Sequence, residues 1–219
     1  MMKPNVLFND IANETSYITS GDDVQYLIKV DDSENTVRLY YQQSKSFKDW
    51  INNFDFPVKL YKDQEQPIAV AQGWGDAYRS CNDEVMHSLL KVTSEHQGYS
   101  VEICGWSYGG AMAVLAAEDF TYRQRKLYVS GLKKIVTLPD VITFGAPKVL
   151  WGKSTLEVFR DSTRMVMQYA NSNDCVTGMP PFLGYTHLNK VEVGDRFNLI
   201  KWFNPGVYHC SYGDASLYE

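Results

Sequence analysis

Residues 100–120 read SVEICGWSYGGAMAVLAAEDF, which is an apolar run, a cluster of small residues and a second apolar run. The first run, Ser100–Cys104, is typical of a buried strand, and the alanine-rich Ala111–Phe120 predicts a helix. Between them, Gly105–Gly109 fits the pattern G-x-S-x-G, which places its serine on a sharp, strained turn when a strand precedes it and a helix follows. We therefore predict that Ser107 lies at the carboxyl end of a strand, with its hydroxyl raised above the sheet.

Strands and helices alternate along the chain on both sides of this stretch. Val24–Val30 and Thr36–Tyr41 are rich in branched and aromatic residues and enclose a turn cluster, which predicts a β-hairpin. Apolar spacing predicts further strands at Ile68–Ala71, Val141–Phe144 and Met165–Ala170, and helices at Phe47–Phe54, Tyr78–Val92 and Ser154–Arg160. This alternation is typical of an α/β fold, so we predict a central, mostly parallel sheet with an antiparallel edge hairpin and flanking helices.

The composition limits the class of protein. The 219 residues contain no repeat or linker, so we predict a single domain over residues 1–219. A hydrophobic content of 44% argues against a disordered chain, and 26 acidic against 21 basic residues argue against a general nucleic-acid-binding surface. The four cysteines lack the spacing of a metal site or a disulfide scaffold, which predicts free thiols and no bound metal.

The N-terminal stretch MMKPNVLFND lacks the apolar core of a leader peptide, and no apolar run is long enough for a transmembrane helix. We therefore expect a cytoplasmic protein; the alternative is secretion by a leader that is absent from this sequence.

One local basic cluster interrupts the acidic chain; it consists of Arg123, Arg125, Lys126, Lys133 and Lys134. Phosphate binding is one interpretation of this cluster. A solvated surface between core elements is the favoured one.

Asp174 is the acid that fits best beside Ser107. It follows the strand Met165–Ala170, and in an α/β sheet the reacting groups gather at the carboxyl ends of the strands. Asp140 and Asp161 precede their strands, so they are expected at the opposite end of the sheet.

Four histidines are candidates for the general base that a serine nucleophile needs. His87 and His96 precede Ser107, whereas proteins with a serine on such a turn place the base after the acid along the chain. His187 and His209 both satisfy that order, and position alone does not separate them.

A series of motifs, in order along the chain, resembles those of the class 3 (fungal-type) lipase family. They are Tyr41–Trp50, Val70–Trp74 with Ala77 and Tyr78, Gly105–Ala111, Thr143–Val149, Asn173–Val176 with Met179–Pro181, and His209 with Tyr212. The chain is therefore similar to this family from about Val37 to Tyr212. The resemblance implies the α/β-hydrolase fold and a serine carboxylester hydrolase that acts on a lipid or small-molecule ester without a cofactor.

The resemblance also implies roles for single residues. Ser107 corresponds to the family's nucleophile, Asp174 to its acid and His209 to its base. His187 matches a second histidine that the family carries and that is usually not the base, so His209 is favoured over it.

Two groups would bind the oxyanion according to the same resemblance: the backbone N–H of Tyr108, and the N–H and hydroxyl of Ser44. The chain departs from the family motifs near both groups. Gln42 and Gln43 stand where the family has Arg and Gly, Trp106 replaces a histidine, and Tyr108 replaces a leucine. These departures affect the shape of the acyl pocket and the choice of substrate rather than the triad.

A helical apolar stripe is formed by Phe47, Trp50, Ile51 and Phe54. In the family this segment, here residues 46–57, is a lid that covers the active site and makes transient contact with a lipid surface. The alternative is a helix that packs permanently on the core.

The predicted function is that of a lipase or esterase that forms an acyl-enzyme on its serine. Two alternatives stay open. The same triad could serve a phospholipase, a feruloyl-esterase-like enzyme or a thioesterase, or the chain could be a lipase-like scaffold that binds without catalysis. The intact triad favours an enzyme.

Overall fold

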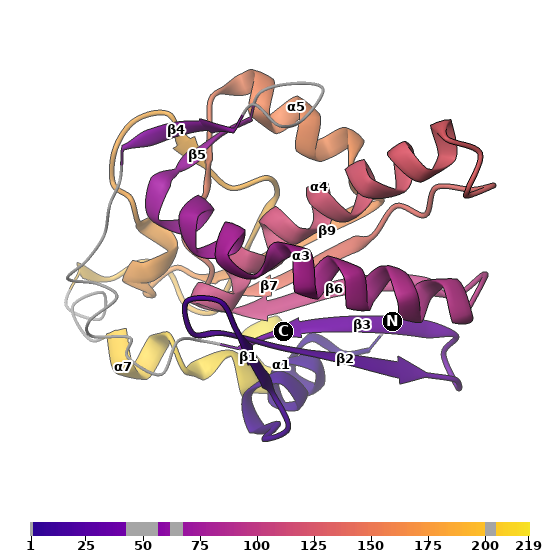
Figure 1. Ribbon diagram of the computed structural model, residues 1–219. Helices are drawn as coiled ribbons and strands as arrows, with labels where there is room; N and C mark the ends of the chain where they lie inside the picture. The colour runs from indigo at the N-terminus through magenta and orange to yellow at the C-terminus, as the bar shows by residue number, and fades with distance from the viewer. Residues whose placement is uncertain (1, 43–56, 62–67, 200–204) are drawn as a thin grey trace.

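A seven-stranded sheet forms the centre of the molecule in a computed structural model that describes residues 2–42, 57–61, 68–199 and 205–219 (Figure 1). Its strands, in spatial order, are β1 (Ile18–Ser20), β2 (Val24–Asp31), β3 (Thr36–Tyr41), β6 (Ser100–Trp106), β7 (Asp140–Phe144), β9 (Met165–Asn171) and β11 (Lys190–Val193). The pairs from β3 to β11 are parallel, whereas β1, β2 and β3 pair antiparallel. The predicted mostly parallel sheet with an antiparallel edge hairpin is therefore confirmed.

Helices lie on both faces of this sheet (Figure 1). On one face are α3 (Gln72–Glu95) and α4 (Tyr108–Val129), and α5 (Lys153–Asp161) packs against α4. On the other face, α1 (Pro4–Asn13) contacts the C-terminal 3₁₀ turns η2 (Ser211–Gly213) and η3 (Ala215–Tyr218).

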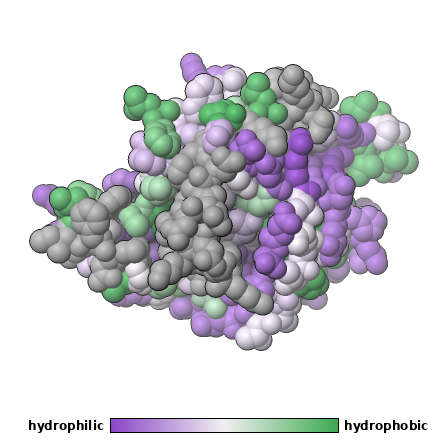
Figure 2. Space-filling model, turned by 60° about the vertical axis from the view of Figure 1, so that its left-hand side comes forward, coloured by the Kyte–Doolittle hydropathy of each residue, from purple (hydrophilic) through white to green (hydrophobic). Residues whose placement is uncertain are grey.

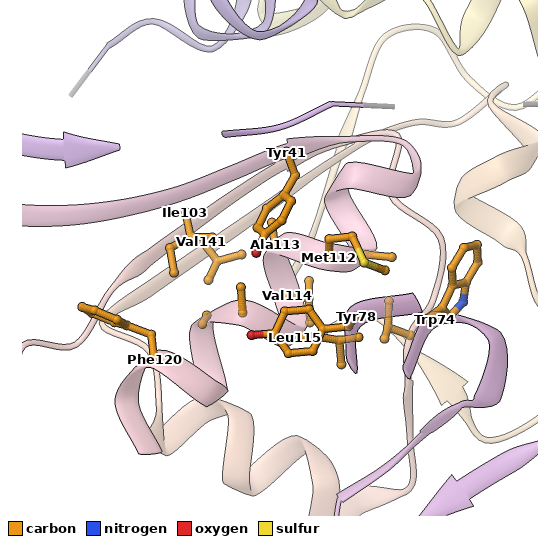
Figure 3. Close-up of a cluster of buried hydrophobic side chains, with 14 of the residues drawn as sticks. Tyr41, Trp74, Tyr78, Ile103, Met112, Ala113, Val114, Leu115, Phe120 and Val141 are labelled. Atoms are coloured by element: carbon orange, nitrogen blue, oxygen red, sulfur yellow. The ribbon is translucent and has the colours of Figure 1, made fainter. Parts of the chain in front are cut away.

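Each inner strand contributes side chains to two separate cores, because successive residues of a strand point to opposite faces. In β3, Tyr41 joins the core beneath α3 and α4, while its neighbour Tyr40 joins the core beneath α1. Figure 3 shows Tyr41, Ile103 and Val141 pointing from the sheet toward the side chains of α3 and α4. All of these side chains are nearly inaccessible to water.

Glycines allow α4 to approach the sheet closely at its N-terminal end. A Cβ atom at Gly105 would lie 2.1 Å from the carbonyl oxygen of Gly109, and one at Gly109 would lie 2.3 Å from the carbonyl oxygen of Tyr41. Both contacts are too short for any side chain, so the small residues around the serine are a steric requirement of the strand–helix junction.

A second sheet is antiparallel and has four strands: β10 (Tyr185–Thr186), β8 (Leu150–Trp151), β5 (Ile68–Ala71) and β4 (Val58–Tyr61). The strand predicted at Ile68–Ala71 has the predicted bounds but belongs to this smaller sheet. Short elements complete the described chain, namely η1 (Cys175–Gly178) and α7 (Pro205–Tyr208).

The sequence prediction differs from the structure mainly in length and at the N-terminus. The helix predicted at Ala111–Phe120 continues to Val129, and the helix α1 was not predicted. Its buried side chains, Leu7, Phe8 and Ile11, follow a helical spacing, but this apolar pattern covers little more than one turn and does not by itself predict a helix. The helix predicted at Phe47–Phe54 lies outside the described residues.

Candidate active site

Ser107 lies between the end of β6 and the start of α4, in a backbone conformation that non-glycine residues seldom adopt. Its φ is 58° and its ψ is −122°. The backbone N–H of Ser107 donates to the carbonyl oxygen of Phe144 over 2.8 Å, which ties the turn to the end of β7. Because such strain persists only where the surrounding structure enforces it, the turn marks a candidate functional position.

The Ser107 side chain is fully buried, and within the described part of the chain its hydroxyl has no hydrogen-bond partner. Unpartnered buried hydroxyls are uncommon in native structures and call for an explanation. A hydroxyl that must react with a substrate provides one.

Asp174 holds a buried histidine at the end of β9. Its Oδ2 atom lies 2.8 Å from Nδ1 of His209. The same oxygen accepts a hydrogen bond from the hydroxyl of Tyr212 over 2.8 Å, and Oδ1 accepts one from the backbone N–H of Val176 over 3.0 Å. With its carboxylate held by several donors, Asp174 can orient the imidazole so that a neutral ring carries its proton on Nδ1 and leaves Nε2 as the acceptor.

Tyr212 stays a neutral hydrogen-bond donor in this arrangement. Burial, the nearby carboxylate of Asp174 and the hydrogen bond to it raise the pKa of the phenol well above its usual value. The phenol oxygen in turn accepts a hydrogen bond from the backbone N–H of Asn171 over 2.9 Å. The resemblance matched Tyr212 to a motif, but the sequence did not indicate that it would donate to the acid.

Two further observations place the histidine at the edge of the sheet that carries the serine. The indole N–H of Trp106, next to Ser107 in the chain, donates to the carbonyl oxygen of His209 over 3.2 Å. Gly145, directly after β7, has a φ of 57°, and a Cβ atom there would lie 2.9 Å from both Asp174 Oδ2 and His209 Nδ1. The residues that follow β6, β7 and β9 therefore converge around one site, as expected for the carboxyl ends of parallel strands.

His187 lies between β10 and β11 and has a different partner. Its Nε2 atom is 2.9 Å from the backbone carbonyl oxygen of Thr177. Burial lowers the pKa of His187 to about 4, and the nearby ammonium groups of Lys190 and Lys148 act in the same direction, whereas the contact with Thr177 opposes the shift. Among the described residues, Nδ1 of His187 has no hydrogen-bond partner. His187 thus lacks the carboxylate partner that His209 has.

Tyr108 is the first residue of α4, so its backbone N–H lies at a helix N-terminus, where the aligned peptide dipoles favour negative charge. Its buried ring lies against Trp74, with the ring centroids 5.8 Å apart. Ser44 and the stripe of Phe47, Trp50, Ile51 and Phe54 lie outside the described residues, so the second oxyanion group and the lid at 46–57 stay predictions.

Within the described ranges, no group of three or more histidine, cysteine or acidic side chains could hold a metal ion. None of the helices in these ranges has both the length and the apolar composition needed to cross a bilayer.

Known proteins share this sequence pattern and architecture. The model of the family described as lipase (class 3) matches residues 39–184. The lipase of Rhizomucor miehei is 28% identical over 213 residues, covering 87% of this chain and 55% of the relative. The secreted mono- and diacylglycerol lipase A of Penicillium cyclopium is 23% identical over 184 residues, covering 82% of this chain and 53% of the relative. A solved structure of the Rhizomucor miehei lipase propeptide complex has a TM-score of 0.70 at 23% identity, covering 83% of this chain and 56% of that chain.

The structural likeness confirms the predicted α/β-hydrolase fold. The chain spans about half the length of the curated relatives it matches. The cytoplasmic location expected from the sequence gains no support, because the Penicillium relative is named a secreted protein.

Proposed function

The chain belongs to the class 3 lipase family, and we propose that it is a serine carboxylester hydrolase of lipase or esterase type. The observation that carries the proposal is the 2.8 Å contact between Asp174 and His209 at the edge of the sheet where the strained Ser107 lies. The three residues follow the order and the relation of nucleophile, acid and base that acyl transfer requires.

In the proposed reaction, the Ser107 hydroxyl attacks the ester carbonyl while Nε2 of His209 takes its proton. Asp174 keeps the second ring proton on Nδ1 and stabilises the positive charge that develops on the imidazole. The backbone N–H of Tyr108, at the N-terminus of α4, donates to the oxyanion of the tetrahedral intermediate. His209 then protonates the leaving alcohol, and a water molecule activated by the same ring hydrolyses the acyl-enzyme.

The proposed substrate is a lipid ester. The family supports this proposal, and so does the Penicillium relative, which is named a mono- and diacylglycerol lipase.

The proposal is tested by replacing the nucleophile. Ser107→Ala is expected to lower kcat/KM on a short p-nitrophenyl ester by about 10⁴–10⁶-fold, because triad members act as a unit. It should also abolish covalent labelling by a fluorophosphonate. The matched control is Ser130→Ala, at the far end of α4, which should leave both readouts unchanged.

The wild-type chain is then compared on p-nitrophenyl esters of increasing acyl length, on a triacylglycerol emulsion and on phosphatidylcholine. Preference for the phospholipid would favour the phospholipase alternative. Absence of ester hydrolysis and of labelling in the wild type would leave only the non-catalytic scaffold and overturn the proposal.

A further inference from the structure

A ridge of exposed apolar side chains is formed by the last turn of α4 and the segment after it. Val129, Leu132 and Ile135 are exposed by 82%, 79% and 72%, and Tyr128 by 53%. Figure 2 shows that the hydrophobic side chains on the face it displays lie in separate groups among hydrophilic ones. A local group of large, strongly exposed apolar residues is the kind of surface that marks an interaction site.

The ridge lies in a segment of the chain, residues 121–139, that carries a strong positive charge. Residues 121–139 contain five basic residues and no acidic residue, whereas the rest of the chain contains 16 basic and 26 acidic residues. Lys126 precedes the apolar ridge along the chain, and Lys133 and Lys134 lie within it, between Leu132 and Ile135. Apolar tips between lysines are complementary to an anionic, partly apolar partner.

The positive charge of Lys133 is not compensated by an acidic side chain within the described part of the chain. Its half-buried side chain lines a hollow of about 540 Å³ together with Leu132, Ile135, His96 and Tyr99. Within the described part of the chain its ammonium group makes no hydrogen bond or ion pair, and burial alone lowers its pKa. Arg123 differs, because it is bound by the carboxylates of Asp83 and Asp119.

The ridge and Ser107 lie at opposite ends of the sheet. Tyr99, which lines the hollow, immediately precedes β6, and Ser107 immediately follows it. Figure 1 shows the loop after α4 at the right-hand edge of the molecule, whereas β3 ends toward the left. A strand of this length spans about 20 Å, so the ridge is separate from the rim of the candidate active site.

We propose that the ridge of Tyr128, Val129, Leu132 and Ile135, with Lys126, Lys133 and Lys134, docks the protein on an anionic lipid bilayer. The apolar tips enter the boundary between headgroups and acyl chains, and the lysines pair with the lipid phosphates and carboxylates. The proposal does not depend on the hydrolase activity, because none of these residues belongs to the candidate triad.

The test is co-sedimentation of the full chain with vesicles of ether-linked phospholipids, which offer no carboxylic ester to the active site. Vesicles of equal parts phosphatidylcholine and phosphatidylserine are expected to bind the protein, and vesicles of phosphatidylcholine alone to bind it much less. Each lysine near an anionic surface contributes about fivefold to partitioning, so Lys133→Gln/Lys134→Gln should weaken binding by about 20-fold. Leu132→Ser/Ile135→Ser should weaken binding to a similar degree, because it removes the inserted apolar area.

Lys3→Gln/Lys153→Gln is the matched control, since it removes two exposed lysines outside the ridge. It should bind like the wild type, and all variants should keep the wild-type rate on a soluble ester. Equal binding to both kinds of vesicle, or an equal loss in the control, would overturn the proposal. A second result would also overturn it: the wild type does not bind vesicles but is a dimer in light scattering, and Leu132→Ser/Ile135→Ser is a monomer. The ridge would then bind a second copy of the chain.

Discussion

Two histidines that follow Asp174 in the chain have different surroundings in the fold. Nδ1 of His209 lies 2.8 Å from a carboxylate oxygen of Asp174, whereas Nε2 of His187 lies 2.9 Å from the backbone carbonyl oxygen of Thr177. Both contacts hold the ring in one orientation. Only the first offers a full negative charge to stabilise a protonated ring.

The comparison shows that burial alone does not make a histidine a useful base. Burial without a counter-charge lowers the pKa of His187 to about 4, so at neutral pH the ring is a neutral hydrogen-bonding group. A general base must take a proton during the reaction, and a carboxylate partner supplies the compensation for that charge. The predictions that follow test this distinction, beginning with the largest effect.

The largest difference is expected between alanine variants of the two histidines. His209→Ala should lower kcat/KM on a short p-nitrophenyl ester by about 10⁴–10⁶-fold, and His187→Ala by less than about tenfold. Circular dichroism of each variant checks that the fold is kept. The reverse pattern would assign the base to His187 and break the comparison.

The acid is expected to have the next largest effect. Asp174→Asn should lower kcat by about 10⁴-fold, because an amide in place of the carboxylate favours the wrong tautomer of His209. The control is Asp161→Asn, an exposed aspartate before β9, which should leave kcat unchanged. A small effect of Asp174→Asn would mean that the His209 contact is structural, like that of His187.

Trp106 should have a moderate effect through the backbone of His209. Trp106→Phe removes the N–H that donates to the His209 carbonyl but keeps an aromatic ring in the core beneath α1. Loss of one hydrogen bond of about 1 kcal/mol should lower kcat by about fivefold while KM stays the same, because the indole N–H binds the backbone of the proposed base. An increase in KM at constant kcat would instead place Trp106 in the substrate pocket.

The smallest effect concerns stability and pH at His187. The pKa of His187 is lower in the folded chain, about 4, than its usual 6.5. Between these values the unfolded chain binds the additional proton, so the free energy of unfolding decreases as pH falls through this window, by about 3 kcal/mol in all.

His187→Gln should remove this decrease, as measured by urea unfolding at several pH values from 7 to about 4. His87→Gln, at an exposed position of α3, is the matched control and should keep the wild-type pH dependence. A wild-type stability that does not fall between pH 6.5 and 4 would show that the ring of His187 is protonated within the fold.

Much of the central fold was predictable because it depends on local patterns. The hairpin β2–β3 follows from two branched and aromatic runs around a turn cluster, and β6, β7 and β9 follow from short apolar runs. The smaller sheet was not predictable in the same way. β8 and β10 are only two residues long each and are strands only because they pair with one another, and β8 also with β5.

The N-terminal helix and the surface after α4 were likewise not predictable from local sequence patterns. Leu7, Phe8 and Ile11 make a short apolar face that gains its stability from the core shared with Trp106, Phe144 and Tyr212. Residues 123–134 were recognisable as basic, but the exposure of the apolar side chains among them was not readable from their order.

The sequence by itself determined the turn that carries Ser107, because the glycines, the strand before it and the helix after it are neighbours in the chain. It also favoured Asp174 as the acid, because this residue follows a strand, and limited the base to His187 or His209 by residue order; the resemblance then favoured His209. Only the tertiary structure decided which histidine contacts the carboxylate. His209 is 35 residues from Asp174 in the chain, and the two meet because the C-terminal segment packs back against α1 and the sheet. Contacts over such a distance depend on the whole packing of the chain, which local spacing does not encode.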